Sequence, residues 1–221
     1  MTHNVLKNRR YVKKYDQTAE IPESLIDSML RDAWEVTPSK NNFMPYTIHV
    51  IGPDRQDYKE KIFQVCLANE GKVDQVETSN LLDDRYKGYL PQYSNMLTCS
   101  YLLVFTMRLE TEPNPFQKRA IDNGHRFEAV DETRLNLLHD VTSFEAGMFC
   151  DAFSGMCLEH GIDVSFTGCF GKKVEDWKDV PFVTRKPIMI MSVGKGLVYR
   201  NEGINQFDLR PNYERIVNFV K

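Results

Sequence analysis

Residues 21–53 read IPESLIDSMLRDAWEVTPSKNNFMPYTIHVIGP, a stretch that encodes a helix, a polar loop and a strand in succession. Apolar residues recur at helical spacing over residues 21–36, with Pro22 in the first turn, where proline is tolerated. Residues 37–42 are polar and contain a proline, which predicts that the helix ends and a loop begins. Residues 46–51 then predict a strand, which ends at a Gly-Pro pair.

The rest of the chain continues this mixture of helices and strands. We predict a helix over residues 55–68 and a buried strand over residues 101–107, where seven apolar or small residues follow one another. Residues 135–160 are too densely apolar for a one-sided surface helix, so we expect a central helix that ends at Gly161. Residues 187–193 predict a further strand. The fold class is therefore α+β.

Residues 108–133 lack strong periodicity and contain two prolines, a glycine and many charges. We predict a long excursion that serves as a lid, because long ordered excursions are often functional. Phe116 and Phe127 are the candidate gate residues, since an aromatic side chain there would stack on a substrate. We find no repeat or linker and expect residues 1–221 to form a single domain.

Composition excludes several classes of protein. The net charge is -3 and the pI is near 6.0, so no overall positive field would hold a nucleic acid. No stretch approaches the length of a membrane span, and the N-terminus lacks the apolar run of a signal peptide. The cysteines form no C-x-x-C pair, which suits buried thiols in a reducing compartment such as the cytoplasm. They are Cys66, Cys99, Cys150, Cys157 and Cys169.

Several catalytic motifs are missing from the sequence. It has no G-x-G-x-x-G, G-x-x-x-x-G-K-[ST], H-E-x-x-H or G-x-S-x-G, which argues against Rossmann, P-loop, zincin and hydrolase sites. The five histidines show no paired ligand spacing, so we predict no metal site. Ser192 to Lys195 match S-x-x-K, but the companion elements are missing and we attribute the match to chance.

Four segments carry chemistry that admits two interpretations each. The basic run at residues 9–14 either grips a phosphate or is a solvated surface. The loop at residues 38–45 either meets the polar edge of a heteroaromatic ring or is a plain turn. Residues 165–168 end in a glycine, which either permits close approach to a flat ligand or makes a turn. Arg210, with Lys195 and Arg200 upstream, either closes over a phosphate or stays in solvent.

Taken together, these segments resemble the FMN-binding nitroreductase family. The resemblance rests on their order and spacing: Arg9-Arg10-x-x-Lys13-x-Tyr15-Asp16, Ile21-Pro22-Glu23, Pro38-Ser39-x-x-Asn42-x-x-Pro45-Tyr46, and the late glycines 161, 168 and 194. It implies a mainly antiparallel sheet flanked by helices. It also implies an intertwined homodimer whose terminal segments embrace the partner and whose FMN lies at the subunit interface.

The resemblance also implies roles for individual residues. Arg9, Arg10 and Lys13 would bind the FMN phosphate and ribityl chain, and Arg210 would complete the phosphate site. Pro38, Ser39 and Lys40 would come from the partner subunit. The backbone at residues 165–168 would lie against the flavin, with the Thr167 amide as a candidate donor to N5, while Gln92 and Asn95 would contact ribityl and pyrimidine atoms. The full set of cofactor-binding residues is Arg9, Arg10, Tyr11, Lys13, Pro38, Ser39, Lys40, Asn42, Gln92, Asn95, Ser165, Phe166, Thr167, Gly168 and Arg210.

The sequence departs from the family pattern at four positions within these segments. The family commonly has serine in place of Tyr11 and Lys40, glutamine in place of Met44 and tryptophan in place of Tyr46. Lys40 has two possible roles. It would either stabilise the reduced flavin's negative charge or pair with the substrate.

The function that this resemblance implies is an FMN-dependent oxidoreductase. It would reduce nitroaromatic, quinone or similar electron-poor small molecules with NAD(P)H, by ping-pong kinetics at one shared site. No side chain is predicted to be catalytic, because the cofactor carries the chemistry. The alternatives are a flavin-binding or sensing protein without turnover, and a specialised branch such as a dehalogenase or flavin-modifying enzyme.

Overall fold

The computed structural model describes residues 9–70, 94–127, 129–131, 139–168, 170–171, 173–199 and 216–217. Within them, none of the helices is long and apolar enough to cross a membrane. The elements run in the order β1 (Val12–Tyr15), α2 (Glu23–Val36), η1 (Lys40–Asn42), β2 (Tyr46–Ile51), α3 (Gln56–Glu70), α5 (Asn95–Thr98), β3 (Tyr101–Met107), α6 (Pro115–Asp122), α8 (His139–Glu159), β4 (Asp163–Thr167), η4 (Val174–Trp177), β5 (Pro187–Gly194) and β6 (Gly196–Tyr199).

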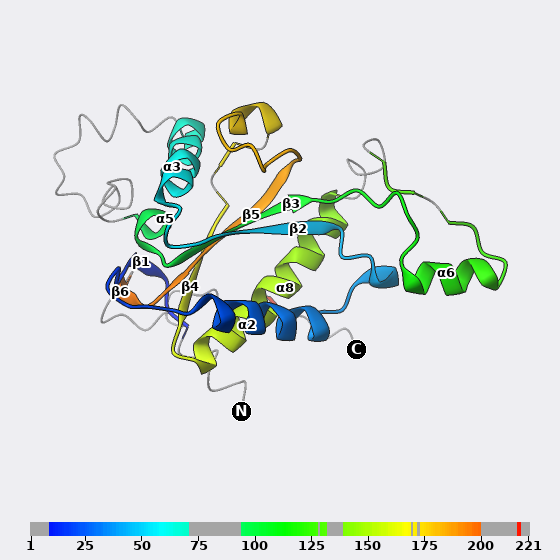
Figure 1. The fold of residues 1–221 in the computed structure, drawn as a ribbon, viewed down its shortest axis with the longest axis horizontal. Helices are drawn as coiled ribbons and strands as arrows, with labels where there is room; N and C mark the ends of the chain where they lie inside the picture. Colours follow the sequence, from blue (N-terminus) through cyan, green and yellow to red (C-terminus); the bar gives the residue numbers. More distant parts are fainter. Residues whose placement is uncertain are drawn as a thin grey trace.

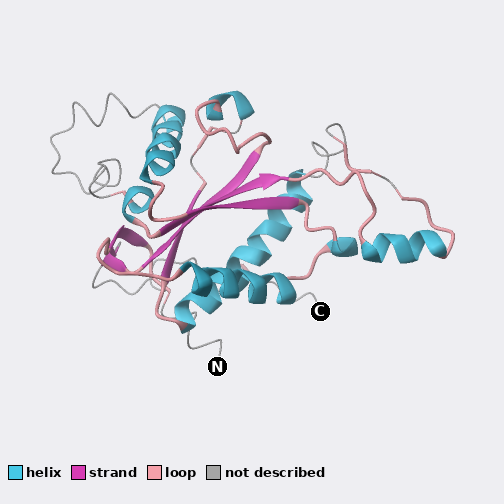
Figure 2. Cartoon of the chain, viewed as in Figure 1, coloured by secondary structure: helices cyan, strands magenta, loops and turns pink. Residues whose placement is uncertain are grey.

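A four-stranded antiparallel sheet forms the centre of the molecule, with strand order β2-β3-β5-β4 (Figure 1). The helices α2 and α8 pack together on one face of it, while α3, α5 and η4 belong to the other (Figure 2). A separate two-stranded sheet pairs β1 with β6 at one end of the molecule. The α+β class with an antiparallel sheet, predicted from the sequence, is confirmed.

The packing of β3 explains why its sequence is apolar at every position except Thr106. Leu103 and Phe105 belong to the hydrophobic core beneath α2 and α8, whereas Leu102 and Val104 belong to the core beneath α3. Successive side chains of a strand point to opposite faces, so a strand covered on both faces favours apolar residues throughout. The exception, Thr106, is hydrogen-bonded to the His49 ring at 3.0 Å. Every residue of β3 is buried.

The helix α8 covers the sheet with one face only. Phe149 and Phe153 are buried against the sheet, but Phe144 is 68% exposed and Val141 is 41% exposed. The sequence predicted a central helix too apolar for a one-sided surface helix, and within one chain α8 leaves Phe144 and Val141 exposed. The dimer interface that the sequence also assigned to this helix stays a prediction. The helix ends as predicted: Gly161 adopts a positive φ of 64°, a conformation that glycine reaches without a steric penalty.

The excursion after β3 is more regular than its sequence suggested. Residues Pro115–Asp122 form α6, which extends from the body of the molecule beside η1 (Figure 1). Its start is a capping box, in which the Asn114 side chain accepts from the Gln117 amide and the Gln117 side chain accepts from the Asn114 amide. An antiparallel bridge between Glu110 and Val130 closes the base of the excursion.

Candidate functional site

The basic residues before β1 lie beside β4, although about 150 positions separate the two in sequence. The Arg9 guanidinium lies 5.1 Å from the centroid of the Phe166 ring, and that of Arg10 lies 3.6 Å from the centroid of the Tyr199 ring. Both arginines are exposed and neither pairs with a carboxylate among the described residues. Two cations resting on aromatic faces therefore remain open to an anion.

Two hydrogen bonds hold β1 against β4. The amide of Val12 donates to the Ser165 hydroxyl oxygen at 3.1 Å, and that hydroxyl donates to the Val12 carbonyl, also at 3.1 Å. Both residues are buried. The Asn95 side chain donates to the same Val12 carbonyl at 3.4 Å, so Asn95 is buried beneath β1 as well. This polar contact fixes where the arginines emerge.

The end of β4 leaves room for a ligand. A Cβ atom added to Gly168 would meet no heavy atom within 4 Å, so the backbone there faces open space. Phe166 and Thr167 are half-buried, and Gly168 itself is exposed. On β1 and just before it, Lys13 is half-buried and Tyr11 is 39% exposed.

Beneath these residues, the Tyr15 side chain joins β1 to β5. Its hydroxyl donates to the Ser192 carbonyl at 2.9 Å, and burial raises the pKa of Tyr15 well above its ordinary value. A Cβ atom on Gly194 would lie 2.7 Å from the Tyr15 ring, so only glycine fits there. Tyr15 is a neutral structural contact at neutral pH.

A second group of candidate residues lies in the loop that contains η1. Ser39 Oγ donates to Glu145 Oε2 at 2.5 Å, and the Lys40 amide donates to Glu145 Oε1 at 3.0 Å. Ser39 Oγ also accepts from the Met44 amide at 2.8 Å. Pro38 and Asn42 are exposed. The buried Glu145 therefore fixes the start of the loop to α8.

Arg108 fixes the other end of this loop. Its guanidinium donates to the carbonyls of Phe43 and Met44 and to the Glu110 carboxylate. Asn41, Asn42 and Met44 all have positive φ, which costs a non-glycine residue about 1 kcal/mol or more. Charge-assisted hydrogen bonds from Arg108 offset part of that cost.

Asn114 connects the loop to α6. While its side-chain oxygen caps the helix, its Nδ2 donates to the carbonyls of Asn41 and Asn42 at 3.2 Å each. One amide side chain thus sets where α6 begins and where α6 docks.

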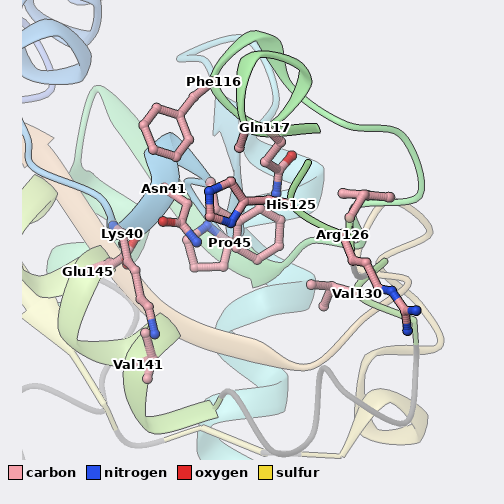
Figure 3. Close-up of a pocket in the computed structure, with 13 residues that line it drawn as sticks. Lys40, Asn41, Pro45, Phe116, Gln117, His125, Arg126, Val130, Val141 and Glu145 are labelled. Atoms are coloured by element: carbon pink, nitrogen blue, oxygen red, sulfur yellow. Dashed lines mark hydrogen bonds between the residues drawn. The ribbon is translucent and has the colours of Figure 1, made fainter. Parts of the chain in front are cut away.

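A pocket of about 440 Å³ lies between η1, α6 and α8 (Figure 3). Phe116 and Phe127, the two gate candidates, both line it, together with Lys40. Figure 3 shows the Lys40 side chain extending past Glu145 towards Val141, with Phe116 on the opposite side of the pocket.

Within one chain, the two groups of candidate residues lie at opposite ends of the sheet (Figure 1). The loop leads into Tyr46, which pairs with Met107, whereas Tyr15 of β1 contacts Ser192 near the far end of β5. Along β5, the five residue steps from Ser192 to Pro187, which pairs with Thr106 beside Met107, span about 16 Å at roughly 3.3 Å per residue. The structure therefore does not bring residues 38–42 to Arg9 and Ser165 within the same chain.

Two predicted residues, Gln92 and Arg210, lie outside the described residues. Three further residues that shape the site were not predicted from the sequence, namely Glu145, Arg108 and Asn114. Asn114 had a readable signal, because Asn-Pro-x-Gln is a capping-box sequence with proline at the first helical position. Glu145 and Arg108 act on backbone groups distant in sequence, and no local pattern marks them.

Comparisons with known proteins bear on the fold. No family model matches the sequence, and no curated protein is significantly similar to it. Among solved structures, a nitroreductase-like protein from Streptococcus mutans matches 99% of this chain and 97% of its own, with 17% identity and a TM-score of 0.63. A proposed nitroreductase from Exiguobacterium sibiricum, solved in complex with FMN, matches 100% and 97%, with 18% identity and a TM-score of 0.65.

The chain has the nitroreductase-like fold. A proposed NAD(P)H:FMN oxidoreductase from Staphylococcus epidermidis agrees, with a TM-score of 0.66 and 18% identity over 100% of this chain and 96% of its own. The residues present fit the flavin of such a fold at two points. The exposed guanidinium groups of Arg9 and Arg10 suit a phosphate, and the space where a Cβ of residue 168 would lie suits a flat ring.

Proposed function

We propose that this chain is a cytoplasmic FMN-dependent oxidoreductase that reduces nitroaromatic, quinone or similar electron-poor small molecules with NAD(P)H. The observation that carries the proposal is the position of Arg9 over Phe166. It joins the basic run expected to bind the FMN phosphate to the strand expected to lie against the flavin ring. A phosphate group and a planar ring belong to one FMN molecule, so the two predictions support each other.

In the proposed complex, the cations Arg9, Arg10 and Lys13 hold the phosphate, and Arg210 completes that group. Charge-assisted hydrogen bonds from guanidinium groups bind phosphate well because the planar fork matches two oxygens. The backbone at residues 165–168 lies against the ring. Asn95, buried beneath β1, and Gln92 supply further polar contacts.

The proposed site is completed by a second copy of the chain. Pro38, Ser39, Lys40 and Asn42 lie far from Arg9 in their own chain, so they would reach a flavin only in a neighbouring subunit. Phe144 supports this proposal, because a large apolar side chain exposed on a long helix suits an interface. The functional unit is therefore proposed to be a homodimer.

Bound FMN supplies hydride transfer between NAD(P)H and the acceptor. For a quinone, one hydride from NAD(P)H and one proton from water give the hydroquinone and leave NAD(P)⁺. The chain's own residues bind and orient the participants, and no protein nucleophile is required. Because the sequence has no dinucleotide-binding fingerprint, NAD(P)H and the acceptor are proposed to use one shared site in turn.

The test begins with the visible spectrum and flavin content of the purified protein. We expect about one FMN per chain, bleached rapidly by NADH or NADPH without oxygen and recoloured by a quinone. Bound flavin that NAD(P)H leaves oxidised would favour a sensing protein without turnover. A colourless protein that binds no added FMN would defeat the proposal. Initial rates over a grid of both substrates should give parallel double-reciprocal lines, since intersecting lines would indicate a ternary complex.

A further inference from the structure

The pocket beside η1 has the size and walls of a small-molecule site. Its volume of about 440 Å³ falls within the range of roughly 300 to 1,000 Å³ usual for such sites. Phe43, Phe116 and Phe127 come from three different segments and line the same space. Phe116 is 47% exposed although it belongs to an ordered helix. Aromatic walls of this kind suit a planar conjugated compound.

The charge in the pocket favours an anion. Two cations, Lys40 and Arg126, line it against one carboxylate, that of Glu145. Both Glu145 oxygens already accept hydrogen bonds, from the Ser39 hydroxyl and the Lys40 amide. Lys40 itself forms no ion pair with any carboxylate in the part of the chain that the structure describes.

A backbone hydrogen bond fixes the position of Lys40, although the residue is exposed. Its amide donates to Glu145, a buried residue of α8, and from that fixed point its side chain lines the pocket and extends towards Val141 (Figure 3). Arg126 lies at the other side of the pocket, beyond Val130. The cation nearest to the wall formed by α8 is therefore Lys40.

We propose that this pocket binds an electron acceptor that is both planar and anionic, such as an aromatic carboxylate. Its ring packs among the phenylalanines and its carboxylate pairs with Lys40. The inference rests on the proposed function and names the substrate class of that site. The inference also favours one of the two roles considered for Lys40, namely pairing with the substrate. The reason is that Lys40 lines the same pocket as Phe116 and Phe127.

A matched pair of probes tests the proposal by direct binding, without turnover. Para-nitrobenzoate is planar and anionic, and para-nitrobenzamide is its neutral counterpart of similar shape. By titration calorimetry on the protein as purified, we expect the carboxylate to bind about fivefold more tightly, the effect of one partly exposed ion pair. Lys40→Met should remove this preference, while Lys40→Arg should keep it. The matched control Lys178→Met, at an exposed lysine beyond η4, should change nothing.

Flavin content, measured for each variant, separates this proposal from the proposed function. Equal binding of the two probes by the wild type, no binding of either, or an unchanged preference in Lys40→Met would overturn it. All variants are compared with FMN added, because Lys40 also belongs to the proposed flavin site, so that a changed preference reports on the carboxylate of the probe and not on the flavin content. Phe116→Ala should weaken both probes equally and leave the preference intact. A protein that binds no flavin but still prefers the carboxylate would contradict the proposed function and leave the anion preference of the pocket standing.

Discussion

Glu145 Oε2 accepts a hydrogen bond of 2.5 Å from Ser39 Oγ, joining two residues that lie 106 positions apart. The same carboxylate accepts from the Lys40 amide, and Glu145 is only 3% exposed. A buried carboxylate is costly unless its oxygens are hydrogen-bonded, and here the loop supplies both donors. The loop and the helix α8 therefore depend on each other for their stability.

Replacing Glu145 with glutamine should loosen the loop. The glutamine side chain accepts through its oxygen only. Its NH2 group would face either the Ser39 hydroxyl or the Lys40 amide, and both of these donate to Glu145. We expect the free energy of unfolding to fall by about 1 to 3 kcal/mol. Urea denaturation measures it, with Glu159→Gln at the exposed end of the same helix as the control. Equal stabilities of the two variants would show that the Glu145 contact contributes little.

Replacing Arg9 with glutamate should release FMN and leave the fold intact. Arg9 is exposed and lies over the Phe166 ring, so the change places a like charge against phosphate without disturbing the core. We expect the dissociation constant of FMN to rise at least about tenfold, as expected for loss of a charge-assisted hydrogen bond. Flavin fluorescence measures it. Lys178→Glu carries the same charge change elsewhere and should bind normally, and unchanged binding by Arg9→Glu would place the phosphate site elsewhere.

Two variants of Asn114 separate the capping of α6 from its docking. Asn114→Asp keeps an acceptor for the Gln117 amide but loses the Nδ2 donors to Asn41 and Asn42. Asn114→Ala loses both and should cost about 1 kcal/mol more, the usual effect of removing an N-cap.

Hydrogen exchange of residues 115–122 reports the result. Exchange should be faster in the alanine variant, whereas the aspartate variant should keep helical protection but bind the pocket's probes more weakly. Asn123→Ala, at the other end of α6, serves as the control. Identical exchange in all three variants would show that the cap does not hold the helix.

The sequence predicted those elements in which apolar residues form a clear pattern, either a helical repeat or a continuous run. The strands at residues 46–51 and 101–107 appear with those bounds. The second is buried at every position, as its run of apolar residues indicates, and the first ends at the Gly-Pro pair. The strands β1 and β6 were not predicted. Each has four residues, β1 carries Lys13 and Lys14, and their pairing has irregular register.

The sequence predicted residues of the candidate site within single segments, but not the contacts between segments. The basic run and the residues of β4 could be named separately, but no pattern in either one indicates that Arg9 lies over Phe166. The contacts of Arg108 with the carbonyls of Phe43 and Met44 could not be predicted for the same reason. A backbone carbonyl has no sequence signature, so its partner is visible only in the folded chain.

The cysteines offer a test of the core with a defined pH dependence. Four of the five are buried and form no disulfide among the described residues, and Cys169 lies outside those residues. Burial raises the pKa of Cys99 to about 11 and that of Cys150 to about 12. Because only the thiolate reacts, raising the pH from about 8 to about 9 should not make these thiols reactive in the folded protein.

A chromogenic disulfide reagent should therefore label at most one thiol in the native protein and all five after denaturation. The linkage has a definite sign. A raised folded pKa means that the folded state holds the proton more tightly, so these thiols' contribution to stability is complete below about pH 8.5. It declines as the pH rises towards the folded values. Rapid labelling of two or more native thiols would contradict the buried positions.

The exposed face of α8 provides the test of the proposed homodimer. Phe144 is 68% exposed and Val141, one helical turn away on α8, is 41% exposed, so burying this part of the helix against a partner would be favourable. Replacing Phe144 with glutamate would bury a charge in that interface, and we expect a monomer that has lost most of its FMN, because the flavin site takes residues 38–42 from the neighbour. Sedimentation velocity and flavin content report the two effects. Leu197→Glu, a similar change at a 54% exposed residue of β6, should leave the dimer intact. A wild-type protein that is monomeric yet saturated with FMN would refute the shared site, and a dimeric Phe144→Glu variant would move the interface away from α8.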